Sequence, residues 1–153
     1  MLWLRRTQKT DYNAVDRLLL QLHAVDMQGR PEQFAPCDHY MSREAFENLL
    51  DNENIRAFLA REHGQTVGCC FVSMLERSGA KPHKSAYIDL LVVDREHRRR
   101  GIGRTMFRHV QQYAREAGAD SVELMVWNYN EAAMQAYRAY GMTPQRSIYE
   151  YRL

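Results

Sequence analysis

Apolar and polar residues repeat along the chain with two different periods, and this pattern divides the sequence into expected strands and helices. Leu2–Arg6 alternates as a short first strand. A helix is expected to begin at Thr10-Asp11, because an apolar stripe at helical spacing follows: Ala14, Val15, Leu18, Leu19 and Leu22. The pattern is lost between Ala24 and Met41, which predicts a long loop.

The middle of the chain has the pattern of an antiparallel sheet. Ser42 can cap a second helix that turns Phe46, Leu49 and Leu50 inward. Ile55–Arg61 and Thr66–Leu75 are then expected to form a hairpin across a turn that contains His63-Gly64. A loop over Ser78–Lys84 leads into Ala86–Val93, a strongly apolar strand that belongs at the centre of a sheet.

The last third alternates between helices and strands. Gly103–Ala117 is the clearest amphipathic helix, and Gly118 follows it as a cap glycine. A strand over Ser121–Trp127, a helix over Glu131–Tyr140 and a closing strand over Ser147–Leu153 are expected next. Residues 1–153 are therefore predicted to form a single α/β (α+β) domain with a mixed sheet.

Composition narrows the class of protein further. The 21 Lys and Arg residues nearly balance 19 Asp and Glu residues, so bulk charge does not indicate a nucleic-acid or membrane partner. Three cysteines, two of them adjacent at Cys69-Cys70, do not suggest disulfides, and no secretion signal or spanning segment is recognisable. We expect a cytoplasmic protein. No spacing of His, Cys and acidic residues resembles a metal site.

The most informative segment runs from Tyr87 to Arg104, where an apolar strand enters an Arg-rich turn and a helix follows at once. Gly101 and Gly103 remove side chains where a ligand must approach the backbone closely. The first amides of a helix have no partner inside it, and the helix dipole favours negative charge there. This arrangement predicts a site for a pyrophosphate-bearing cofactor.

Three kinds of phosphate-binding loop compete for this element. A P-loop requires a Gly-Lys pair that is absent here. The dinucleotide fingerprint requires a small residue at position 106, where Met106 stands, although Asp120 and Glu123 lie at a suitable distance for its acidic partner. A plain solvated turn and a nucleic-acid patch are further interpretations of the arginines.

The third kind of loop fits best. Arg98-Arg99-Arg100-Gly101-Ile102-Gly103 resembles Arg/Gln-x-x-Gly-x-Gly/Ala, the acetyl-CoA motif of the GNAT superfamily of N-acetyltransferases. The run Asn130-x-x-Ala133-x-x-x-Tyr137-x-x-x-Gly141-Met142 resembles the family's second motif, and the C-terminal half is similar to ribosomal-protein alanine N-acetyltransferases. The resemblance covers residues 85–153 well and residues 1–84 only in the order of elements.

The resemblance implies a GNAT-like mixed, mostly antiparallel sheet with a splayed parallel strand pair and about four flanking helices. It implies that acetyl-CoA binds with its pyrophosphate on the amides of residues 99–104 and its pantetheine arm along the central strand. The implied cofactor residues are Leu91, Val92, Val93, Arg98, Arg99, Arg100, Gly101, Ile102, Gly103, Arg104, Asn130, Ala133 and Tyr137.

Acetyl transfer to an amine requires a general acid for the departing thiolate and a route for the amine proton. By the resemblance, Tyr137 is the general acid. The position of the related enzymes' catalytic Glu is occupied by Met125, so the base is left open between Glu123, Asp89 and a chain of water molecules.

The acceptor is expected to be a small-molecule or peptide primary amine, bordered by the loops at residues 24–41 and 78–84, where Asp26, Glu32 and Asp38 can attract a cation. A homodimer is expected through sheet edges or the C-terminal strand. Two alternatives remain: a non-catalytic acyl-CoA-binding member of the same fold, and a nucleic-acid-binding module that uses the Arg cluster.

Overall fold

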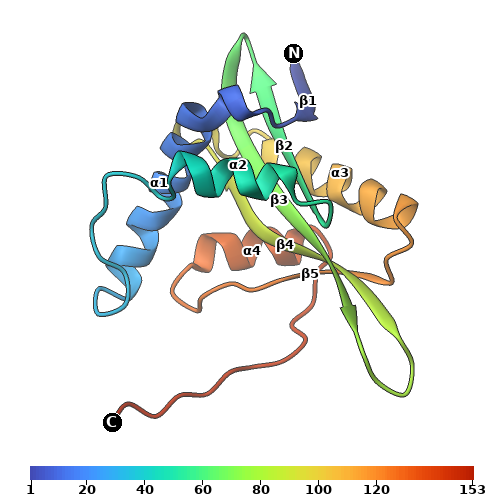
Figure 1. The fold of residues 1–153 in the computed structure, drawn as a ribbon. Helices are drawn as coiled ribbons and strands as arrows, with labels where there is room; N and C mark the ends of the chain where they lie inside the picture. The colour runs from blue at the N-terminus through green and yellow to red at the C-terminus, as the bar shows by residue number, and fades with distance from the viewer.

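The computed structural model describes all 153 residues as one sheet with helices on both of its faces (Figure 1). The strands are β1 (Leu2–Arg6), β2 (Ile55–Glu62), β3 (Gln65–Arg77), β4 (His83–Val93) and β5 (Ser121–Leu124). The α-helices are α1 (Tyr12–Gly29), α2 (Arg43–Asp51), α3 (Ile102–Glu116) and α4 (Glu131–Ala139), with short 3-10 turns at Lys9–Asp11 and Arg95–His97. The strand order is β1-β2-β3-β4-β5; β1 to β4 are antiparallel, and β5 lies parallel to β4. The predicted mixed, mostly antiparallel sheet is confirmed.

Local sequence explains several of the element boundaries. His63 (φ 48°) and Gly64 (φ 77°) both take positive φ and form a two-residue turn between β2 and β3, inside the turn that was expected there. The Ser42 side chain accepts a hydrogen bond from the Ala45 amide at 3.1 Å and begins α2 as predicted. Gly118 (φ 75°) ends α3, and the amide of Ala119 reaches back to the carbonyl of Ala114 at 2.9 Å.

Two apolar layers hold the helices against the sheet. One layer joins α3 to one face of the sheet, through buried residues that include Met106 and Val110. The other joins α1 and α2 to the opposite face, through residues that include Leu18 and Phe46. Consecutive residues of a strand point to opposite faces, so Cys70 belongs to the first layer and Cys69 to the second. Both are buried free thiols that point to opposite faces of the sheet.

A β-bulge interrupts β4 and changes the face of the sheet to which the following side chains point. Val72 pairs with Ile88 and Phe71 pairs with Leu90, which leaves Asp89 as an extra residue without a partner on β3. Ile88 packs in the α3 layer, yet two residues on, Leu90 packs in the α1 layer and Leu91 faces α3 instead. Apolar residues on both sides of Asp89 concealed the bulge, because either alternation fits them.

Four predicted boundaries are wrong: the end of α1, the end of β3, the start of β4 and the end of β5. Helix α1 continues to Gly29, through the first residues of the predicted loop, because no helix breaker precedes that glycine. Strands β3 and β4 extend beyond their predicted ends, so the loop between them shortens to residues 78–82. Strand β5 ends at Leu124 rather than Trp127, because the following residues turn away toward α1.

The predicted closing strand Ser147–Leu153 is also wrong. Residues 143–153 form an extended arm that leaves the sheet (Figure 1), and each of these residues is exposed. Glu150 pairs with Arg30 at 3.0 Å and Arg152 with Glu32 at 2.8 Å, so charged side chains of the arm bind the loop after α1. Strand β5 is therefore an edge of the sheet.

Candidate acyl-CoA and catalytic site

Strands β4 and β5 separate halfway along β4. Their parallel pairing runs from Ser85–Ser121 to Ile88–Leu124 and stops there. Strand β4 continues to Val93 and remains paired to β3 on its other side. The candidate residues Leu91, Val92 and Val93 thus lie on a half-strand whose β5 side has no neighbouring strand, where an extended ligand with amide groups can bind.

Contacts with α1 explain this separation. The Tyr129 hydroxyl donates to Asp26 at 2.6 Å, and its ring lies so close to Gly29 that a Cβ there would come within 2.4 Å of it. Trp127 stacks on Tyr129 at 5.8 Å, and the Arg30 guanidinium lies 4.9 Å from the centre of the Trp127 ring. These contacts draw the chain after β5 toward the end of α1 and away from β4.

The turn between β4 and α3 has the backbone of an anion-binding loop. Arg99 (φ 62°) and Gly101 (φ 81°) both take the left-handed conformation, and α3 begins at Ile102 directly afterwards. None of the amides from Arg98 to Arg104 donates a hydrogen bond within the protein. Successive free amides beside a helix N-terminus form a cradle for phosphate oxygens.

The arginine side chains mainly hold this turn in place. Arg98 donates to the Val93 carbonyl at 3.2 Å, and Arg100 pairs with Glu62 at 2.8 Å. Arg104 donates to the Ala139 carbonyl at 3.1 Å and lies 5.3 Å from the centre of the Tyr140 ring. Their charge surrounds the free amides while their donors are partly engaged, an arrangement suited to a bound phosphate rather than to an extended basic surface.

Sequence reasoning missed Asp94, which organises the start of the turn. Its buried carboxylate accepts hydrogen bonds from Gln21 at 2.9 Å and His97 at 3.0 Å, and Arg17 lies 3.5 Å away. Burial alone would raise the pKa of Asp94, but these partners outweigh it and lower the pKa. The Gln21 side-chain oxygen also accepts a hydrogen bond from the Arg95 amide at 2.9 Å, so this side chain of α1 binds both Asp94 and the residue that follows it. The sequence signal that could have identified Asp94 is an acidic residue between an apolar strand and an Arg-rich turn.

Gly101 and Gly103 are required for different reasons. A Cβ at Gly101 would meet nothing within 4 Å, so glycine is needed there for the positive φ. A Cβ at Gly103 would lie 2.5 Å from the Tyr140 hydroxyl. The second glycine therefore admits an aromatic side chain of the protein itself, a contact that the sequence argument assigned to the ligand.

The second motif reflects the structure of α4. The Asn130 side chain caps this helix by accepting from the Ala133 amide at 3.3 Å, which explains the spacing of these two residues. Gly141 (φ 95°) ends the helix, and the Met142 amide donates to the Tyr137 carbonyl at 3.0 Å. The motif thus fixes the helix that carries Tyr137.

The Tyr137 phenol is partly buried beside the separated strands. Burial raises its pKa to about 12, and Cys70 and Tyr140 add smaller contributions in the same direction. Cys70 lies opposite Leu91 in the sheet, so Tyr137 approaches the separated half of β4 from the α3 face. Its hydroxyl has no hydrogen-bond partner in the protein and stays protonated at neutral pH.

The two candidate bases have different surroundings. Burial raises the pKa of Asp89, and a hydrogen bond from the Ser73 hydroxyl at 2.5 Å partly offsets it. Burial acts on Glu123 in the same sense, but hydrogen bonds from Gln145, Ser85 and Arg77 outweigh it and lower the pKa of Glu123. The pKa of Asp89 is thus shifted toward neutral pH and that of Glu123 away from it, and Asp89 lies at the bulge where β5 leaves β4.

Comparison with known proteins settles the class. Residues 19–142, most of the chain, match the model of the acetyltransferase (GNAT) family. The chain belongs to the GNAT family.

Individual proteins resemble this chain in fold or in part of the sequence. A mutant of the BH1408 protein from Bacillus halodurans superposes with a TM-score of 0.95 at 24% identity over 99% of both chains. The aminoglycoside N-acetyltransferase AAC(6')-Iy in complex with CoA superposes with a TM-score of 0.76 at 17% identity, over 99% of this chain and 98% of that one. Streptothricin acetyltransferase from Streptomyces lavendulae is 49% identical over 45 residues, which are 29% of this chain and 24% of that protein.

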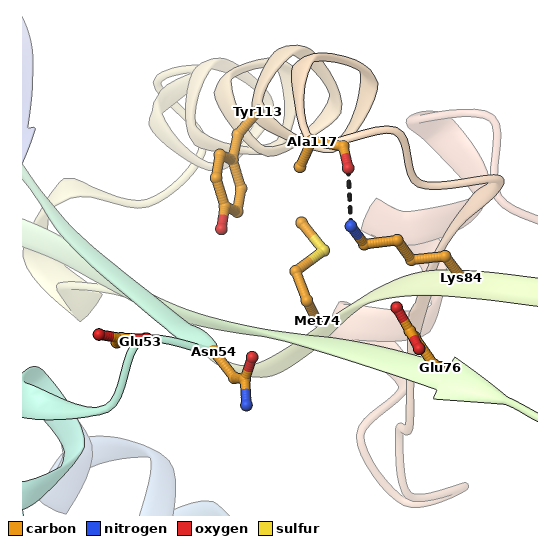
Figure 2. A pocket seen from close by; sticks show the side chains of 7 residues that line it. All are labelled: Glu53, Asn54, Met74, Glu76, Lys84, Tyr113 and Ala117. Atoms are coloured by element: carbon orange, nitrogen blue, oxygen red, sulfur yellow. Dashed lines mark hydrogen bonds between the residues drawn. The ribbon is translucent and has the colours of Figure 1, made fainter.

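One cavity of this GNAT domain lies away from the candidate site. Figure 2 shows this cavity of about 630 Å³ between the start of β4 and the end of α3, with Lys84 donating to the Ala117 carbonyl at 2.8 Å. The anion-binding turn lies at the opposite ends of the same two elements. A smaller cavity of about 160 Å³ adjoins that turn, lined by α1 residues together with Arg95 and Arg98.

The acidic residues expected to attract an acceptor are mostly engaged within the GNAT domain. Asp26 accepts from Tyr129, and Glu32 pairs with Arg30 and Arg152, while Asp38 is exposed. No helix is long and apolar enough to cross a membrane, and no group of three or more His, Cys, Asp or Glu side chains is arranged to hold a metal ion.

Proposed function

We propose that this GNAT domain transfers the acetyl group of acetyl-CoA to a primary amine of a small molecule, by direct attack in a ternary complex. The observation that carries the proposal is the run of free amides at residues 98–104, which follows the half of β4 that has no pairing with β5. A ligand that combines a diphosphate with an amide-containing arm fits both features together.

In this mechanism the amides of Arg99 to Arg104 hold the diphosphate, and the backbone of Leu91 to Val93 binds the pantetheine arm. A free amide on the separated half of β4 stabilises negative charge on the carbonyl oxygen during the attack. Asn130 and Ala133 support the site by fixing the start of α4.

The acid and base approach from opposite faces of the sheet. Asp89, bonded to Ser73, accepts a proton from the attacking amine, directly or through water, while Tyr137 donates a proton to the departing sulfur from the α3 face. The new C–N bond forms as the C–S bond breaks, so an amine and a thioester become an amide and a thiol. Glu123, held ionised by Arg77 and Gln145, is the weaker candidate for the base.

A small-molecule acceptor agrees with the relatives that are named for streptothricin and for aminoglycosides. The test is thiol release from acetyl-CoA with a panel of aminoglycosides, diamines, amino acids and peptide N-termini. Acetyl-CoA consumption that depends on one class of amine supports the proposal. Tight CoA binding without turnover on any amine identifies a non-catalytic acyl-CoA-binding protein instead.

A further inference from the structure

We propose that the Tyr40 hydroxyl binds the attacking amine, and that the buried carboxylate of Asp16 positions Tyr40 for this contact. This role rests on the acetyl transfer proposed above and adds the residue that orients its acceptor. The mechanism leaves both groups unused. Asp16 is only 7% exposed on α1, and the Tyr40 hydroxyl has no hydrogen-bond partner in the protein.

Asp16 ties the loop after α1 to that helix. The loop returns alongside α1 to the start of α2 (Figure 1). The Asp16 carboxylate accepts hydrogen bonds from His39 Nδ1 at 2.9 Å and from the Tyr40 amide at 2.8 Å. One turn earlier on α1, the Tyr12 hydroxyl donates to the Met41 carbonyl at 2.6 Å. Three consecutive residues of the loop are therefore held on one face of the helix, and this fixes the direction of the Tyr40 side chain.

Tyr40 lies on the α1 face of the separated half of β4. Its ring packs against the α1 layer, which includes Val92 and Cys69, and these two residues pair with each other across β4 and β3. Burial raises the pKa of Tyr40, and the nearby Asp26 and Cys69 raise it further, so the phenol is protonated at neutral pH. Tyr137 approaches the same half-strand from the α3 face, so the two tyrosines lie on opposite sides of it.

A row of aromatic rings joins Tyr40 to the segment after β5, which bounds the opening on its other side. The ring centres of Tyr40 and His23 are 6.2 Å apart, edge to face. The same geometry continues from His23 to Phe34 at 6.1 Å and from Phe34 to Trp127 at 6.1 Å. Tyr40 therefore borders the opening that forms where the segment after β5 is drawn toward α1.

These positions give the two phenols different partners. Tyr137 faces the departing sulfur from the α3 face, so the amine attacks from the α1 face, where Asp89 is proposed to accept its proton. The attacking amine must be neutral and must present its lone pair to the carbonyl carbon. A hydrogen bond from its N–H to the Tyr40 oxygen leaves that lone pair free. Because the phenol is neutral, it orients the amine without favouring the ammonium form.

Steady-state kinetics test this role with each amine of the panel that the natural chain acetylates. Tyr40→Phe keeps the ring in the apolar layer, so the variant should fold normally. It should lower kcat/KM for the amine about 10-fold and leave the KM for acetyl-CoA unchanged, because one hydrogen bond to the acceptor is lost.

A second substitution tests whether Asp16 acts through Tyr40. Asp16→Leu should lower kcat/KM for the amine as Tyr40→Phe does, and combining the two should lower it no further. Phe46→Leu is the control for lost stability. It weakens the same apolar layer without removing these hydrogen bonds, so it should leave kcat/KM unchanged.

The results that overturn this role differ from a failure of acetyl transfer itself. Unchanged kcat/KM in Tyr40→Phe removes Tyr40 from the acceptor site while acetyl transfer stands. A raised KM for acetyl-CoA in that variant assigns Tyr40 to the cofactor instead. A double variant whose loss is the product of the two single losses shows that Asp16 does not act through Tyr40. If the natural chain acetylates no amine of the panel, acetyl transfer fails first and the role of Tyr40 fails with it.

Discussion

The Tyr129 hydroxyl donates a 2.6 Å hydrogen bond to Asp26, joining the segment after β5 to the end of α1. This bond lies among the contacts that pull the chain away from β4 and so open the sheet where the pantetheine arm is proposed to bind. The residues that create the site are thus 103 positions apart, and neither belongs to a recognisable motif.

We predict that Tyr129→Phe weakens both the fold and the site. The substitution leaves the Asp26 carboxylate without its donor, so the free energy of unfolding should fall by about 1–2 kcal/mol in a urea titration. Acetyl-CoA affinity should fall as well, because the segment after β5 is no longer held apart. Tyr149→Phe removes a hydroxyl from a 94% exposed ring and should change neither quantity. If both variants keep the stability and the acetyl-CoA affinity of the natural chain, the Tyr129–Asp26 hydrogen bond does not hold β4 and β5 apart.

Gly103 and Tyr140 offer a compensating pair. Gly103→Ala should destabilise the start of α3 and reduce CoA affinity, because the new Cβ meets the Tyr140 hydroxyl at 2.5 Å. Adding Tyr140→Phe removes that oxygen, and the nearest ring carbon then lies 3.7 Å from the Cβ. The double variant should therefore recover most of the lost stability in thermal melts. Failure to recover CoA affinity despite restored stability would show that the ligand itself needs the glycine.

Tyr137→Phe tests the general acid. The variant should retain CoA affinity and lose roughly 10²-fold in kcat, because only the proton donor to the sulfur is removed. A pKa of about 12 keeps the natural phenol protonated, so this group should cause no alkaline loss of activity below about pH 10. Tyr113→Phe, at the far end of α3, is the matched control. Full activity of Tyr137→Phe would return this residue to a packing role.

The Ser73–Asp89 pair predicts the acidic limb of the pH–rate profile. A general base works when deprotonated, so activity should rise with pH through the pKa of Asp89. The Ser73 hydroxyl lowers that pKa, and Ser73→Ala should therefore move the limb to higher pH, whereas Ser73→Thr keeps a hydroxyl and should leave it in place. Asp89→Asn should abolish the limb.

Glu123→Gln provides the comparison for this experiment. It should leave the limb where it is, because hydrogen bonds already hold Glu123 ionised. Movement of the limb in Glu123→Gln alone would transfer the role of base to that residue. A limb that is unchanged in every variant would favour the water chain.

The sequence predicted those parts of the molecule that local chemistry determines. Ser42, Gly118 and the His63-Gly64 turn each fix a boundary through their own backbone or side chain, and each is found where it was expected. The Arg-rich turn and the strand–helix order around it were equally local features. These are the parts that led to the family.

The parts that were missed depend on distant contacts. The bulge at Asp89 could not be located because the residues before and after it are apolar in either alternation, and the early end of β5 depends on α1. The role of Gly103 depends on a tyrosine 37 positions later, so a pattern of neighbouring residues could not reveal it. The strand predicted at residues 147–153 is wrong for a related reason. Its residues alternate as a strand would, but they do not pair with the sheet of their own chain.

Amide NMR during a CoA titration tests the central claim most directly. The account predicts that the resonances of Arg99 to Arg104 shift together and saturate with one equivalent of CoA, while pantetheine, which lacks the diphosphate, shifts Leu91 to Val93 and leaves the turn unchanged. A saturating titration that moves other amides and leaves residues 99–104 in place would contradict it.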